Sequence, residues 1–141
     1  MVSDELKNLV AKLNEQGKMW FLEGVSEKQI TDFEEINQIH LPEQYKEWLL
    51  FSDGGEFFLP AGIQMYGVAH KPIIDVGFSD RPDNSYIVIG AMSNGDPVLC
   101  NKSNKEISIY NHEANRIESE ETFPDFFTFL AELYDLLGIG G

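Results

Sequence analysis

The chain has 141 residues, of which 43% are hydrophobic and 12% aromatic, and its formal net charge is −14. This apolar content excludes a disordered acidic tail, and the lack of an apolar run of about 20 residues excludes a predicted membrane span. The length suits one domain over residues 1–141, which we expect to be soluble and cytoplasmic. The negative field disfavours nucleic acid and anionic membrane surfaces as partners.

The first predicted helix begins after Ser3, a favourable N-cap residue, and ends at Gly17. Asp4 and Glu5 lie in its first turn, where negative charge interacts favourably with the helix dipole. The spacing of its apolar residues follows one helix face, which predicts burial of Leu6, Leu9, Val10 and Leu13.

The second predicted helix opens with a capping box, in which Gln29 reaches back to Ser26. We expect it to end within residues 37–40, because the residue before Pro42 is biased away from helical angles. Its predicted buried positions are Ile30, Phe33 and Ile36.

Pro42 suits the first turn of a third helix, and the run Asp53-Gly54-Gly55 ends that helix. The two glycines are expected to permit a reversal from helix to strand that other residues adopt less readily. The inner face of the helix is predicted to carry Tyr45, Trp48 and Leu49, which we interpret as core rather than as a ligand platform.

Short runs rich in β-branched and aromatic residues follow, separated by turn residues. Asn94–Pro97 and Asn101–Lys105 are predicted hairpin turns, and strands joined by short turns pair antiparallel. The predicted strands span residues 56–59, 65–68, 73–76, 86–89, 98–100 and 107–110.

The last predicted helix is capped by Thr122, has Pro124 in its first turn and ends at Gly138. Its broad apolar face is predicted to carry Phe126, Phe127, Leu130, Leu133, Tyr134 and Leu137. The order of elements predicts an α+β fold, with a mainly antiparallel sheet of five to six strands flanked by N-terminal helices and a C-terminal helix.

The residues offer little support for catalysis or metal binding. The three histidines lie far apart, without metal-ligand spacing, and the single cysteine, Cys100, rules out an internal disulfide and favours a reducing compartment. Cys100 lies in a strand-like run and is expected to pack in the core rather than act as a nucleophile. We expect no catalytic residues, no metal and no cofactor. An enzyme that uses carboxylates or Cys100 stays the weaker alternative.

The excess negative charge is concentrated in two segments. Residues 32–56 hold seven acidic residues against Lys46, and residues 113–141 hold seven against Arg116. Such a field attracts a basic partner, although the same charge also serves solubility.

Several short motifs resemble, in order and spacing, the signature of the SUKH superfamily over roughly residues 23–137. Tyr110-Asn111 and Phe123-Pro124 depart from the common pattern, which leaves the subgroup open. The motifs lie in residues 30–36, 41–49, 53–55, 87–90, 94–99, 110–113 and 123–130.

This resemblance implies an α+β fold without catalytic residues. It also implies a function class, because bacterial members are mostly immunity proteins. These proteins neutralise toxins of contact-dependent or secreted competition systems, and the toxins are often nucleases. Eukaryotic members regulate cell-wall synthesis or serve in ubiquitin-ligase adaptors.

Charge and resemblance together predict an immunity protein that binds a basic toxin. We expect this toxin to be a nuclease and its gene to lie near the gene for this chain. The alternative is a regulatory or scaffold module that binds another protein or a small ligand, and the oligomeric state stays open. The candidate partner-binding residues are Glu34, Glu35, Asp53, Glu56, Asp96, Glu118, Glu120 and Glu121.

Overall fold

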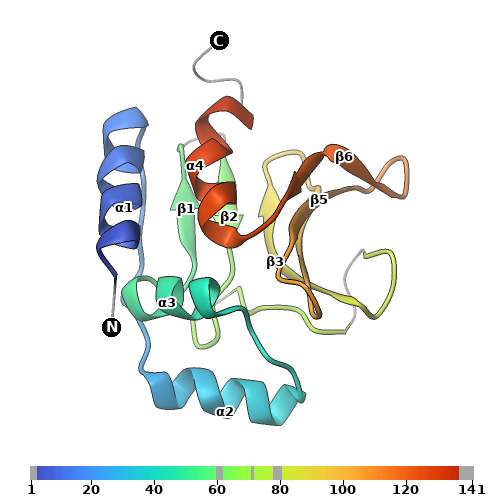
Figure 1. Ribbon diagram of the computed structural model, residues 1–141, viewed down its shortest axis with the longest axis horizontal. Coiled ribbons are helices and arrows are strands. Elements are labelled where there is room, and N and C mark those ends of the chain that lie inside the picture. The colour runs from blue at the N-terminus through green and yellow to red at the C-terminus, as the bar shows by residue number, and fades with distance from the viewer. Residues whose placement is uncertain (1–2, 60–61, 71, 78–80, 137–141) are drawn as a thin grey trace.

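The computed structural model describes residues 3–59, 62–70, 72–77 and 81–136, except for the side chains of residues 118–120. In Figure 1, α1 and α4 stand side by side, α3 lies across their lower ends and α2 is the outermost helix below it. The described elements are α1 (Asp4–Gln16), α2 (Glu27–Asn37), α3 (Glu43–Phe51), β1 (Gly55–Phe57), β2 (Ile63–Met65), β3 (Tyr86–Met92), β4 (Pro97–Asn101), β5 (Ile107–Asn111), β6 (Arg116–Phe123) and α4 (Phe126–Leu136).

The predicted α+β class and antiparallel sheet are confirmed. The six described strands form one sheet in the order β1-β2-β3-β4-β5-β6, and every neighbouring pair is antiparallel. The turn between β3 and β4 falls at the predicted Asn94–Pro97 run, where Gly95 has a positive φ of 95° that glycine adopts readily. Within the described residues, no helix is long and apolar enough to cross a membrane.

Local capping sets the starts of the first two helices, as predicted. The Ser3 hydroxyl accepts a 3.3 Å hydrogen bond from the backbone N–H of Leu6 at the start of α1. At the start of α2, Ser26 accepts from the N–H of Gln29 at 3.1 Å, and the Gln29 side chain accepts from the N–H of Ser26 at 2.9 Å. Both bonds of the capping box are therefore present.

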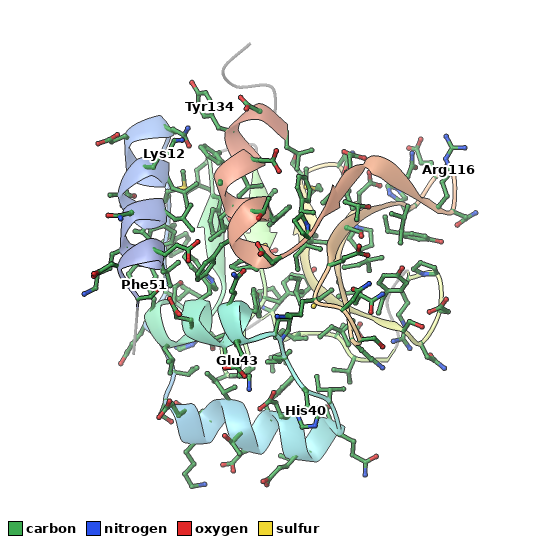
Figure 2. The ribbon with its side chains drawn as sticks, in the orientation of Figure 1. Lys12, His40, Glu43, Phe51, Arg116 and Tyr134 are labelled. Atoms are coloured by element: carbon green, nitrogen blue, oxygen red, sulfur yellow. The ribbon has the colours of Figure 1, made fainter. Side chains whose placement is uncertain are left out.

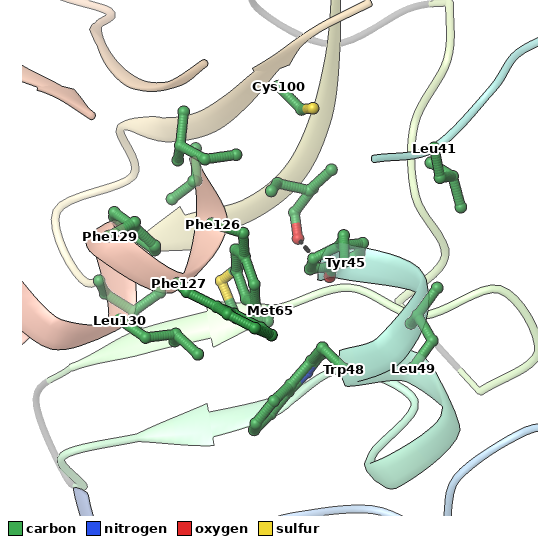
Figure 3. Close-up of a cluster of buried hydrophobic side chains, with 14 of the residues drawn as sticks. Leu41, Tyr45, Trp48, Leu49, Met65, Cys100, Phe126, Phe127, Phe129 and Leu130 are labelled. Carbon is green, nitrogen blue, oxygen red and sulfur yellow. Dashed lines mark hydrogen bonds between the residues drawn. The ribbon is translucent and has the colours of Figure 1, made fainter. Parts of the chain in front are cut away.

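The core lies between the helices and the sheet, and α3 contributes its largest side chains (Figure 3). Tyr45 and Phe126 meet edge to face, with ring centroids 4.7 Å apart. The Tyr45 hydroxyl donates to the backbone carbonyls of Tyr66 and Ile89. The interpretation of the α3 stripe as core is confirmed, because Tyr45, Trp48 and Leu49 are all fully buried.

Two glycines turn the chain from α3 into β1. Gly54 and Gly55 have φ values of 97° and 124°, in the region that residues with a Cβ rarely adopt. A Cβ on Gly54 would also lie 2.5 Å from the carbonyl oxygen of Met65. The reversal places the Gly54 carbonyl where the Trp48 indole N–H donates to it at 3.0 Å.

The prediction that Ile36 is buried is wrong, because its side chain is 80% exposed. At 100° per residue, Ile36 lies about 120° around the helix from Ile30, whereas Asn37 returns to the Ile30 side. Asn37 donates its side-chain amide to the Phe33 carbonyl at 2.9 Å. The inner stripe of α2 is therefore narrower than the sequence pattern suggested.

The predicted cap of the last helix is also wrong. Thr122 is a strand residue opposite Ser108 in the β5–β6 pair, so it is not available as a cap. Asp125 takes this role and accepts a 2.8 Å hydrogen bond from the N–H of Thr128. The predicted end of the helix, Gly138, lies outside the described residues.

Two further differences concern strands. Residues 73–76 do not form a strand, because Ile73 and Asp75 make isolated bridges to different segments, Gly67 and Val88. Residues 116–123 form β6, which the acidic sequence did not predict. Pairing with β5 defines this strand, and the strand itself has few apolar residues.

Candidate protein-binding surface

The predicted site residue Asp53 lies inside the molecule, just after α3, and its carboxylate is fully buried. Its oxygens accept hydrogen bonds from the N–H groups of Val68, Ala69 and His70, at 2.7, 3.0 and 2.6 Å. His70 Nδ1 lies 2.8 Å from the same carboxylate. Asp53 therefore anchors the 68–70 loop and is unavailable to a partner in the folded chain.

Glu34 of α2 has a largely internal role. Its Oε2 accepts a 2.7 Å hydrogen bond from the N–H of Leu41 and lies 3.6 Å from the Lys46 ammonium of α3. Only 11% of its side chain is exposed. This carboxylate therefore ties the end of α2 to the start of α3.

Asp96 lies at the β3–β4 turn, where it accepts from the backbone N–H of His112 at 3.2 Å and pairs with His112 Nδ1. This contact joins the β3–β4 and β5–β6 turns. Sequence reasoning missed both the Asp96–His112 and the Asp53–His70 pairs, because no motif links residues that meet only in the folded sheet.

The other candidate acids are spread over different elements. Glu35 is exposed on α2, and Glu56 is half-buried on β1. Neither side chain has a hydrogen-bond or ion-pair partner among the described residues. Glu121 belongs to β6, as do Glu118 and Glu120, whose side chains lie outside the described residues. The fold therefore does not gather all the candidates into one described site.

An open groove of ≈ 270 Å³ separates α2 from α3, and its acidic rim includes residues that the sequence did not single out. Ile30 and Leu50 lie along it, beside Thr31 and Lys46. Figure 2 shows Glu43 on the α3 side, above α2. The carboxylates that line the groove are Glu27, Glu34, Glu43 and Glu47.

Lys46 balances this negative charge only in part. Its ammonium lies 3.0 Å from Glu43 and 3.6 Å from Glu34. Burial lowers the pKa of Lys46, but the hydrogen bonds and charges of Glu43 and Glu34 outweigh it, so the pKa is raised. The Glu47 carboxylate accepts a hydrogen bond from the backbone N–H of Ser3 at 3.0 Å, and this neutral donor does not cancel the negative charge of Glu47. The groove therefore keeps a net negative charge and suits a cationic group.

The geometry offers little for acid–base or nucleophilic chemistry. Burial raises the pKa of the Cys100 thiol to about 12, so its thiolate is scarce at neutral pH. Burial also raises the pKa of Tyr45. Among the described residues, no group of three or more His, Cys, Asp or Glu side chains is arranged to hold a metal ion.

Comparison with known proteins gives one family. The family model described as "SMI1 / KNR4 family (SUKH-1)" matches residues 24–132, which run from the segment before α2 into α4. No curated protein matches the chain.

Proposed function

The chain belongs to the SMI1/KNR4 family (SUKH-1), and we propose that it is an immunity protein that binds and neutralises a basic protein toxin, with a nuclease as the most fitting kind. The family includes immunity proteins. The observation that best supports the proposal is the acidic groove between α2 and α3, which four carboxylates and a single lysine line.

The physical basis is charge complementarity. A nuclease needs a basic surface to hold phosphate groups, and a protein with a net charge of −14 attracts that surface over several ångströms. Attraction of this kind raises the association rate more than it raises the final affinity. Exposed carboxylates would then occupy the places of phosphates on the toxin and exclude its substrate.

The α2–α3 region supplies such carboxylates. Residues 27–51 contain six acidic residues against Lys28 and Lys46, and Lys28 already pairs with Asp32 at 2.8 Å. Glu27 and Glu35 have no ion-pair partner among the described residues, so their charge is available to a partner. We propose Glu118, Glu120 and Glu121, which belong to β6 and not to the α2–α3 region, as further partner-binding residues.

The test is neutralisation of a toxin encoded next to this chain. Co-expression should restore growth of cells that produce the toxin, and the purified chain should inhibit its activity at equimolar concentration. The charge-reversal variant Glu35→Lys should inhibit the toxin less well than Glu15→Lys does. Glu15→Lys is the matched control, because Glu15 is an exposed residue of α1.

The proposal fails if no neighbouring gene encodes a toxin and repeated pull-downs instead recover the same housekeeping protein. That result would favour the regulatory or scaffold role. Inhibition that does not change between low and high salt would remove the electrostatic basis, even if the chain protects cells.

A further inference from the structure

Trp20 extends the sheet at its β1 edge. Its backbone N–H donates to the Glu56 carbonyl at 2.8 Å, and the Glu56 N–H donates to the Trp20 carbonyl at 2.8 Å. Residues that exchange both hydrogen bonds in an antiparallel pair lie directly opposite one another, with both side chains on one face. The Trp20 indole and the Glu56 carboxylate are therefore neighbours on the sheet.

The same face continues across the next two strands. Glu56 lies opposite Gln64 of β2, and Gln64 lies opposite Ala91 of β3. Because side chains alternate along a strand, the adjacent Phe57 points to the other face, where it is fully buried in the core. Trp20, Glu56, Gln64 and Ala91 thus form one row across the outer face of the sheet.

This row carries an unusually exposed aromatic side chain. Trp20 is 59% exposed, whereas the other tryptophan, Trp48, is fully buried. Its backbone is fixed to β1, so presenting the ring to a partner costs little conformational entropy. Tryptophan is also among the residues that most often contribute strongly to binding at protein interfaces.

Hollows lie on both sides of the row. One, of ≈ 120 Å³, is lined by Trp20, Leu22, Pro72 and others, and the second, of ≈ 350 Å³, lies toward Ala91 and Met92. Glu56 and Gln64 line both hollows and so form the ridge between them. A side chain that approaches Trp20 from solvent therefore meets the Glu56 carboxylate beside an apolar wall.

We infer that Trp20 and Glu56 form a receptor for a cationic side chain, lysine or arginine, on a protein partner. The indole face attracts a cation, and the neighbouring carboxylate pairs with its charge. The aliphatic stem of the cation fits the wall formed by Leu22 and Pro72. The net charge of −14 favours this occupant over an acidic one. The inference deepens the proposed function, because it names a contact that a basic toxin would use.

The test uses the full chain and a defined probe. A blocked Gly-Arg-Gly-Arg-Gly peptide is titrated into the ¹⁵N-labelled protein, with the glutamine analogue of the peptide as a control. The indole N–H signal of Trp20 should shift and saturate with the arginine peptide alone. The Trp48 indole N–H, bonded to the Gly54 carbonyl inside the core, should stay in place and serves as an internal reference.

Variants test whether the Trp20 indole and the Glu56 carboxylate both contribute to peptide binding. Trp20→Leu and Glu56→Gln should each raise the Kd of the arginine peptide by about two- to fivefold, as expected for an exposed cation–π contact or ion pair. Trp20→Phe keeps a π face and should bind better than Trp20→Leu. Glu15→Gln removes one charge from α1 and should leave the Kd unchanged. The three positions Trp20, Glu56 and Glu15 are solvent-facing or half-buried, so these variants should fold.

Peptide-induced shifts in the α2–α3 groove without any at Trp20 would overturn the inference, and so would equal weakening of peptide binding by Glu56→Gln and Glu15→Gln. A shift of Trp20 with the glutamine peptide would indicate a neutral ligand and would also count against it. The proposed function is judged separately. If the arginine peptide binds at Trp20 but no toxin is neutralised, only the proposed function fails. If the Trp20→Leu variant neutralises a toxin with the same potency as the parent chain, the inference fails.

Discussion

The carboxylate of Asp53 and the imidazole of His70 meet at 2.8 Å, although one is fully buried and the other reaches the surface. Together with the backbone N–H groups of residues 68–70, this contact fixes the loop after β2 to the end of α3. The candidate binding carboxylate Asp53 thus has a defined role in holding the fold.

Asp53→Ala should therefore lower the free energy of unfolding by about 3 kcal/mol or more, because several donors lose their acceptor at once. Urea denaturation followed by circular dichroism measures this change. Asp32→Ala, which breaks a surface ion pair with Lys28, is the matched control and should cost less than about 0.5 kcal/mol. Equal losses in the two variants would contradict the anchoring role.

Gly54→Ala should destabilise the protein by at least about 2 kcal/mol, because it forces a Cβ onto a residue with positive φ. The new Cβ would also lie 2.5 Å from the Met65 carbonyl oxygen. Gly77→Ala is the control, since a Cβ there meets nothing within 4 Å. Thermal denaturation should separate the two variants, and an unchanged Tm for Gly54→Ala would show that the turn can relax.

Cys100 should react slowly with Ellman's reagent in the folded protein and rapidly after unfolding in urea. Burial raises its pKa from 9.0 to about 12, so at pH 8 the folded thiol holds about a thousandfold less thiolate than the unfolded one. Between pH 9 and about 12, only the unfolded chain ionises at this group. The contribution of Cys100 to stability is therefore complete below pH 9 and is lost as the pH rises toward 12. Fast labelling of the folded chain at pH 8 would contradict this burial.

Binding of a neutralised toxin should weaken by about tenfold or more between 50 and 500 mM salt, because exposed charges are screened. Surface plasmon resonance should assign most of this loss to the association rate. Glu27→Lys and Glu35→Lys should slow association further, since both carboxylates lack ion-pair partners among the described residues. Glu15→Lys on α1 is the control. If it slows association equally, the effect comes from the net charge of the protein and not from the α2–α3 region.

Local sequence determined the features that depend on neighbours in the chain. The Ser26–Gln29 capping box, the α3 stripe with Trp48 and the Asn94–Pro97 hairpin follow from short-range hydrogen bonding and from helical or turn geometry. The overall charge and its two acidic segments could also be read directly from the sequence. These features suffice to predict an α+β fold and an attraction to basic partners.

Tertiary structure alone decided which acidic residues are available. Asp53 meets His70, Glu34 meets Lys46 and Trp20 meets Glu56 only because the chain returns to the same place in space. The residue type does not show whether a carboxylate lies in the interior or on the surface. Its role depends on which donors the fold brings within hydrogen-bond distance. The same reason explains β6, whose acidic sequence becomes a strand because β5 offers it a ladder of backbone partners.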